Sequence, residues 1–178
     1  MNKELNNIIF LKDLSEINVS DIISSKGSIV GLDVGDKTVG VSISDRRIKI
    51  ASSIAVIMRK NVDVDCAKLF TCIKPYDPKA IIFGWPLQMD GQPSKQCAKN
   101  LEFIKHFRKF LRVSENNQMQ DIVFSKWDER FSTKVIDNIM IEADLSRKRR
   151  KEVIDKTAAV YILQGAIDFL NRNARGTI

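Results

Sequence analysis

A strand–turn–strand pattern over residues 28–44 constrains the fold of this chain more than any other feature. In its first half, aliphatic residues at every second position alternate with Gly31, Asp33 and Gly35, which is the period of a strand that buries one face. Residues 38–44 alternate in the same way after a short turn. The pattern predicts an antiparallel hairpin in which Asp33 projects from a face otherwise made of glycine.

The apolar pattern changes its period several times after the hairpin. Strands are predicted at residues 48–57, which continue the antiparallel sheet, and at the buried apolar runs 80–83 and 122–124. Helical spacing of apolar residues predicts helices at 64–73, 93–111, 132–143 and 153–169. An antiparallel beginning followed by crossover units indicates an α/β fold, with a mixed five-stranded sheet and helices on both faces.

The predicted organisation is a single main domain. A chain of 178 residues with 44% apolar composition is long enough to bury one sizeable core. We divide it into an N-terminal extension over residues 1–27, a domain over 28–172 and a C-terminal tail over 173–178. Apolar residues between Ile8 and Leu14 favour a short amphipathic helix in the extension, and whether this helix docks on the domain is left open.

Basic residues outnumber acidic ones by 29 to 22, and they gather in two segments. Residues 95–112 hold six basic side chains against Glu102 alone, and residues 147–151 are basic without interruption. A solvated helix face and a solvated loop explain each segment singly about as well as a binding role does. Together in one small domain, the two segments favour a polyanionic partner such as nucleic acid.

Cysteine and histidine usage excludes several kinds of site. The three cysteines form no CxxC pair and His106 is the only histidine, so neither a disulfide framework nor a zinc site is supported. The N-terminal residues lack the uninterrupted apolar stretch of a signal peptide, and no segment approaches transmembrane length. These observations predict a cytoplasmic protein without a membrane partner.

Carboxylates at three places in the pattern require a cation or strong hydrogen-bond donors. Asp33 lies on a predicted central strand, where burial removes its hydration. Asp128 and Glu129 follow a predicted buried strand, at the carboxyl edge where open α/β sheets bind ligands. Asp155 shares a helix face with the apolar residues three, four and seven positions after it, so it is predicted to face inward.

Each carboxylate also has an ordinary structural explanation. Asp33 can accept backbone hydrogen bonds in a glycine-rich turn, and the others can complement a helix dipole near a helix start. Taken singly, the two explanations are about equal. Taken together, Asp33, Glu129 and Asp155 form an oxygen-only set suited to Mg²⁺ or Mn²⁺. Two such ions about 4 Å apart can activate water and neutralise the departing oxygen of a phosphodiester.

Four motifs in the chain together resemble the YqgF, or RuvX-like, family. They are GLDVGDKTVGVSISD at the first hairpin, FGWPLQMDG after the middle strand, WDERFST after the last strand and IDKTAAVYILQGAIDFL in the final helix. The resemblance spans residues 29–170, and four motifs in this order are specific. Proteins of this family are described as Holliday-junction resolvases and as nucleases that mature the precursor of the small-subunit ribosomal RNA.

The resemblance implies a ribonuclease-H-like, three-layer fold and a metal-dependent nuclease that acts in ribosome biogenesis, in DNA recombination or in both. It assigns Asp33, Glu129 and Asp155 as catalytic residues and as ligands of Mg²⁺ or Mn²⁺, with two ions expected. It also implies that residues 84–87, interpreted as a loop, border the active cleft. Substrate contacts are expected from Lys37, Trp85, Asp128, Arg130, Arg147, Lys148, Arg149 and Arg150.

The sequence gives further information on Trp85 and Lys37. Trp85 can stack on an unpaired base or simply cap the core. Lys37 is followed by Thr38, where relatives commonly carry two basic residues, which predicts a weaker grip on phosphate at the hairpin.

Other functions and states stay open at the level of sequence. A nucleic-acid or ribosome-binding module on the same fold would need no carboxylate cluster, so a Mg²⁺ titration separates it from a nuclease. The Asp-Val-Gly hairpin also resembles the phosphate loop of actin-like and sugar kinases, but those enzymes clamp ATP between two such domains, and 178 residues fit one. The substrate can be ribosomal RNA precursor or branched DNA, and the chain can be a monomer or a homodimer.

Overall fold

The computed structural model describes residues 11–113, 119, 121–128 and 147–175, with the side chains of the last helix described over residues 157–173. Within these residues, five strands form one sheet in the order β3-β2-β1-β4-β5. The antiparallel strands are β1 (Ser28–Val34), β2 (Thr38–Ser44) and β3 (Ala51–Met58). β4 (Pro78–Trp85) is parallel to β1, and β5 (Val123–Asp128) is parallel to β4. The predicted mixed sheet is confirmed.

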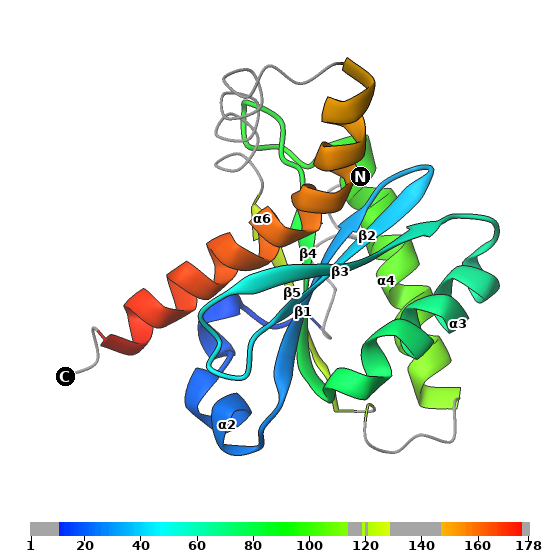
Figure 1. Ribbon diagram of the computed structural model, residues 1–178. Helices are drawn as coiled ribbons and strands as arrows, with labels where there is room; N and C mark the ends of the chain where they lie inside the picture. The colour runs from blue at the N-terminus through cyan, green and yellow to red at the C-terminus, as the bar shows by residue number, and fades with distance from the viewer. Residues whose placement is uncertain (1–10, 114–118, 120, 129–146, 176–178) are drawn as a thin grey trace.

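Helices cover both faces of the sheet (Figure 1). α3 (Val62–Ile73) and α4 (Lys95–Val113) lie on one face, and the short η2 (Lys74–Tyr76) joins α3 to β4. α6 (Arg147–Arg175) crosses the other face with η1 (Leu14–Glu16) and α2 (Val19–Ser24). The predicted three-layer arrangement is confirmed, whereas the helix predicted at 132–143 lies outside the described residues. No helix in the described part of the chain is long and apolar enough to cross a membrane.

Strand alternation assigns each residue of β1 to one of two cores. Val30, Leu32 and Val34 are buried with side chains of α3 and α4. Ile29 is buried with side chains of α6 and the N-terminal segment. Because successive side chains point to opposite faces, Asp33 belongs to the α6 face.

α6 approaches the centre of the sheet closely because Gly31 has no side chain. A Cβ on Gly31 would lie 2.6 Å from Leu163 Cβ and 2.9 Å from the carbonyl oxygen of Ala159. Ser42, which faces Gly31 from β2, donates its hydroxyl to that same carbonyl oxygen at 2.7 Å. The first half of the hairpin and the middle of α6 are therefore in direct contact.

Several predicted strand boundaries were wrong. Ile48 was expected to lie in the third strand but is buried in a turn with a φ of 52°, and β3 begins at Ala51. Residues 84–87 were expected to form a loop, but Trp85 is the last residue of β4 and pairs with Asp128 at the end of β5. Pairing between these parallel strands extends both of them beyond the apolar runs that predicted them.

The described part of the N-terminal extension docks on the domain. Leu11 forms a parallel bridge with Phe124 of β5, and the backbone N–H of Lys12 donates to the Phe124 carbonyl at 2.9 Å. The helix here is α2, begun by Asn18, whose side chain accepts backbone N–H groups of its first turn. The helix predicted between Ile8 and Leu14 is wrong at its described end, because Leu14 starts the short 3₁₀ helix η1. The buried apolar residues of this segment are Leu14, Ile17, Val19 and Ile22.

Candidate active site

The carboxyl ends of β1, β4 and β5 meet at one edge of the sheet because these three strands are parallel. Asp33 is the penultimate residue of β1, and Asp128 is the last residue of β5. Neighbouring strands lie about 4.8 Å apart, so β1 and β5 are about 10 Å apart with β4 between them. The edge thus gathers the described residues of the predicted site.

Asp33 is half-buried in the centre of the sheet. Its partner in β2 is Gly40, which has no side chain to crowd the carboxylate. Gly31, two residues earlier on the same face, is covered by α6. The two glycines nearest to Asp33 on this face therefore add no side chain of their own, and α6 passes close to the strand at Gly31.

Side-chain hydrogen bonds along α6 give its direction across the sheet. Near the middle of the helix, Ser42 donates to Ala159. Further along, the Gln164 side chain accepts the backbone N–H of Ala51 at 2.9 Å. Ala51 pairs with the end of β2 that lies beside the start of β1. α6 therefore runs from the carboxyl edge of β1 toward its amino end (Figure 1).

This direction brings the backbone positions of Asp155 and Asp33 to the same edge. Asp155 precedes Ala159 by one helical turn, about 6 Å, and Asp33 follows Gly31 by two strand residues, about 7 Å. Ala159 and Gly31 are in contact, so the two aspartate positions lie on one face of the sheet. The side chain of Asp155 and the whole of Glu129 lie outside the described residues.

Asp128 lies on the other face of the sheet. Trp127 packs on the α6 side against Phe169, with ring centroids 6.2 Å apart. The next strand residue points the opposite way, so Asp128 is directed toward the α4 side, where it is half-buried. The structure does not bring Asp128 onto the face that carries Asp33.

Trp85 is part of the core and only 5% exposed. Its ring packs edge-on against Phe83, with centroids 6.1 Å apart, and the Lys126 ammonium lies 5.2 Å from its centroid. Of the two roles considered from the sequence, core packing is the one that the structure shows. A base cannot stack on this ring unless the ring first leaves the core.

The basic residues predicted to bind substrate have different positions. Lys37 is exposed in the turn between β1 and β2. Beside it, Asp36 accepts a hydrogen bond from the Lys99 ammonium at 2.7 Å, which lowers the pKa of the Asp36 carboxyl. Residues 147–150 form the first turns of α6 rather than a loop, and Arg130 lies outside the described residues.

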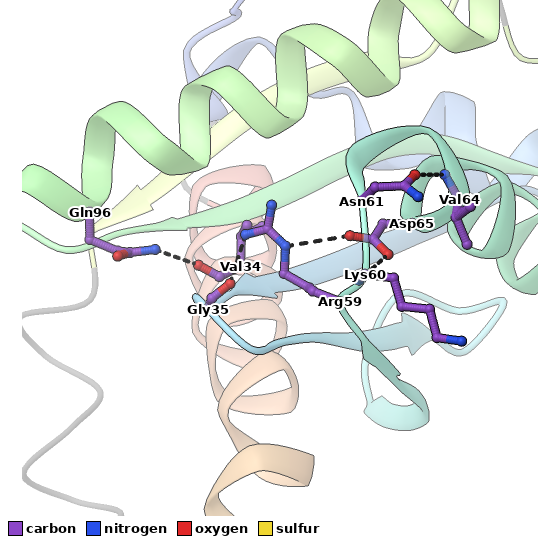
Figure 2. Close-up of polar contacts among 8 residues, drawn as sticks. All are labelled: Val34, Gly35, Arg59, Lys60, Asn61, Val64, Asp65 and Gln96. Atoms are coloured by element: carbon purple, nitrogen blue, oxygen red, sulfur yellow. Dashed lines mark hydrogen bonds and ion pairs between the residues drawn. The ribbon is translucent and has the colours of Figure 1, made fainter.

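Arg59, directly after β3, contacts the turn that follows Asp33, and its role was not predicted. Its guanidinium Nη1 donates to the Gly35 carbonyl at 2.9 Å, and its backbone N–H donates to the Lys37 carbonyl at 2.9 Å. Its Nε lies 3.6 Å from the carboxylate of Asp65, a residue of α3 whose side chain is 1% exposed. Figure 2 shows the guanidinium between Gly35 and Asp65.

Two amides of α4 hold the ends of β1 and β4 and were also missed. Gln96 donates from Nε2 to the Val34 carbonyl at 2.9 Å and to Asn100 Oδ1 at 3.0 Å. Asn100, 2% exposed, donates to the Gly84 carbonyl at 2.9 Å. A signal for Asn100 existed in the sequence, because it occupies an inward position of the predicted helix, four residues before Ile104.

Of the three predicted metal ligands, the structure describes the side chain of Asp33 alone. Asp33 offers carboxylate oxygen, which Mg²⁺ and Mn²⁺ prefer. Cys66 is the cysteine nearest to Asp33 in the sequence, and a thiolate would be a soft metal ligand. It is buried in the core, however, and burial raises the pKa of its thiol to about 12. No group of three or more His, Cys, Asp or Glu side chains within the described ranges is arranged to hold a metal ion.

Comparison with known proteins identifies the family to which this chain belongs. A family model described as "RuvX: Holliday junction resolvase" matches residues 27–169. A relative from Ruegeria pomeroyi is 37% identical over 143 residues, which are 80% of this chain and 87% of the relative. One from Rhodospirillum centenum is 36% identical over 162 residues, 91% and 83% of the two chains. Both are named "Putative pre-16S rRNA nuclease".

T. thermophilus RuvC in complex with a Holliday junction substrate matches with a TM-score of 0.48 and 10% identity, over 85% of this chain and 97% of that chain.

Proposed function

Because this chain belongs to the RuvX family of Holliday junction resolvases and is a nuclease that hydrolyses phosphodiester bonds, we propose that Asp33, Glu129 and Asp155 form its catalytic centre. The observation that carries this proposal is the contact of α6 with Gly31. It brings the backbone of Asp155 to the edge where Asp33 lies. Glu129 directly follows the end of β5 at that edge in the sequence.

The three carboxylates would bind Mg²⁺ or Mn²⁺, and we propose two ions. Such ions supply Lewis acidity for attack of water on the phosphodiester. Asp33 lies on the central strand β1, where its partner Gly40 contributes no side chain. Asp33 comes from β1, Glu129 from the segment after β5 and Asp155 from α6. The centre would therefore depend on how α6 packs on the sheet.

The substrate contacts remain part of the proposal. Lys37 is exposed in the turn after Asp33, where its ammonium can reach a phosphate beside the centre. Arg130 and the basic residues that begin α6 are proposed to contact the backbone of the same strand, and Asp128 to orient the centre from the opposite face of β5. Trp85 is not included, because it lies in the core.

The natural substrate is proposed to be a ribosomal RNA precursor, cut near the 5′ end of its 16S part, or a Holliday junction. The relatives are named for the first, and the family model for the second. We place the enzyme in the cytoplasm, a reducing compartment in which Cys66 and Cys72 persist as free thiols.

Cleavage of both substrates by wild-type protein and Asp33→Asn tests the proposal. The wild type should cleave one of them in a Mg²⁺-dependent manner, and Asp33→Asn should lose more than about 100-fold in rate, since even loss of a residue that orients a ligand costs 10–100-fold. Asp21→Asn, which removes an exposed carboxylate of α2, is the matched control and should keep full activity. Equal rates for wild type and Asp33→Asn would refute the assignment, and tight binding without cleavage would indicate a binding module.

A further inference from the structure

Side chains donate hydrogen bonds to backbone carbonyls where β1 and β4 end. The Val34 carbonyl accepts from Gln96, and the Gly35 carbonyl accepts from Arg59 (Figure 2). The Gly84 carbonyl accepts from Asn100. All three donors reach the edge from the α3–α4 side of the sheet, which is the side opposite to Asp33.

We infer that Gln96 and Arg59 are positioning residues of the nuclease centre, which fix the end of β1 and thereby the carboxylate of Asp33. The inference rests on the proposed role of Asp33. Val34 and Gly35 follow Asp33 directly, so a shift of either carbonyl rotates the peptide groups next to Asp33. In this role the two residues act through the backbone of β1 and need no contact of their own with substrate or metal.

Arg59 is itself held from three directions. Its Nε faces the buried carboxylate of Asp65, and its guanidinium lies over the Phe103 ring of α4, 5.2 Å from the centroid. Asp65 also accepts the backbone N–H of Lys60 at 3.0 Å, which ties the end of β3 to the start of α3. A planar guanidinium can serve Asp65 and the Gly35 carbonyl at the same time, and an ammonium cannot reproduce this fork.

Gln96 couples the ends of the two parallel strands. The backbone pairing of β1 with β4 extends as far as Leu32 and Phe83. Beyond that pair, Gln96 bonds the end of β1, Asn100 bonds the end of β4, and the two amides bond each other at 3.0 Å. The hydrogen bonds of Gln96 and Asn100 thus connect β1 to β4 where the backbone pairing stops, just before Asp33.

If Gln96 and Arg59 had a purely structural role, replacing them would lower the stability of the fold without changing the rate of the chemical step. The control for this alternative is Gln164, a half-buried glutamine of α6 that binds backbone in the same manner at the other end of the sheet. It accepts from Ala51 N at 2.9 Å and donates to the Lys49 carbonyl at 3.0 Å. Replacing Gln164 removes comparable bonds but leaves the end of β1 untouched. It also leaves the contact of Ala159 and Leu163 with Gly31, which holds α6 beside β1, with its own partners.

The experiment measures kcat, KM and urea unfolding for wild type, Gln96→Leu, Arg59→Met and Gln164→Leu. Gln96→Leu and Arg59→Met should lower kcat by about 10–100-fold, the effect of a displacement of about 1 Å at a catalytic centre, with KM changed less than about two-fold. Gln164→Leu should be destabilised as much as Gln96→Leu but keep kcat within about two-fold of wild type.

Chemical rescue separates the donor function of Arg59 from its bulk. Arg59 lines a cavity of about 500 Å³ at the surface, together with Lys60 and Phe103, so a small cation can enter when the side chain is shortened. Ethylguanidinium should restore part of the kcat of Arg59→Ala, and ethylammonium at the same concentration should not. Arg59→Lys should resemble Arg59→Met.

Hydrogen exchange provides a readout that does not depend on cleavage. Amide exchange over residues 33–37 should accelerate in Gln96→Leu and Arg59→Met but not in Gln164→Leu. Wild-type kcat or unchanged exchange in Gln96→Leu, with an active wild type, would overturn the inference alone. A wild type that cleaves neither substrate would overturn the proposed function, and the inference with it.

Discussion

Asp45 organises the turn between β2 and β3 through its carboxylate. The carboxylate oxygens accept the backbone N–H groups of Lys49 at 2.6 Å, Ile50 at 2.9 Å and Arg47 at 3.3 Å. Burial raises the pKa of Asp45, but these backbone bonds outweigh burial and hold its pKa below the ordinary value. A carboxylate with a depressed folded-state pKa stabilises the fold above its unfolded pKa and loses this contribution as pH falls through the folded pKa.

Asp45→Asn should therefore lower the free energy of unfolding at pH 7 by about 1–2 kcal/mol, the cost of losing charged acceptors for backbone N–H groups. The difference from wild type should shrink as pH falls through the folded pKa of Asp45, where the wild type also loses its charge. Urea unfolding of both proteins at neutral and acidic pH measures this. A gap that stays constant over the whole pH range would contradict the assigned role.

The same carboxylate explains why a strand boundary escaped prediction. Ile48 continues an apolar run in the sequence, but the turn around Asp45 gives it a φ of 52° and buries it against α6, where Asn171 donates to its carbonyl at 2.7 Å. Its apolar character reflects burial and not strand pairing. The spacing of apolar residues indicates only which side chains are buried, so it could not distinguish a buried turn residue from a strand residue.

At the level of elements, the close contact of α6 with β1 links packing to the proposed centre. Gly31→Ala should force α6 away, because the new Cβ would lie 2.6 Å from Leu163 Cβ. We expect a loss of about 1–3 kcal/mol in stability and a loss of activity larger than the fraction unfolded explains, since Asp155 moves with the helix. Gly27→Ala is the control, because its Cβ would lie 2.5 Å from Lys79 Cγ and should also cost stability, but without contacting α6 or the end of β1 that carries Asp33. Equal activity per folded molecule in both variants would refute the link.

Elements whose patterns are local were predictable from the sequence. The hairpin of β1 and β2 and the helix α4 follow from alternation and helical spacing within a few residues. The last residues of β4 and β5 were not predictable, because Trp85 and Asp128 become strand residues only by pairing with each other. Strand ends of this kind depend on partners far away in the sequence.

The candidate site divides in the same way. Asp33 stood out because a charged residue interrupts an otherwise apolar and glycine strand. Gln96 and Arg59 did not stand out, because a glutamine at a helix start and an arginine after a strand are ordinary surface residues. Their importance arises from backbone carbonyls that lie 62 and 24 positions away in the chain.

For the whole molecule, the charge distribution predicts how nucleic acid binds. The exposed side of α4 presents Lys95, Lys99, Lys105, Lys109 and Arg112. Affinity for either substrate should fall steeply with salt, and Lys105→Gln should reduce the slope of log K against log salt by about one if this lysine contacts a phosphate. Lys26→Gln, which removes the same charge next to α2, should leave the slope unchanged. Identical slopes for wild type and Lys105→Gln would show that Lys105 contacts no phosphate.

The short bridge of Leu11 and Lys12 with Phe124 has a consequence beyond the site. Among the described strands, β5 is the outer one on its side of the sheet. An outer strand with open N–H and C=O groups can template the addition of a foreign strand. Leu11 and Lys12 cover part of the open edge of β5, at Phe124. A protein shortened to begin at Gly27 would uncover it, and self-association through β-strand addition would then compete with folding.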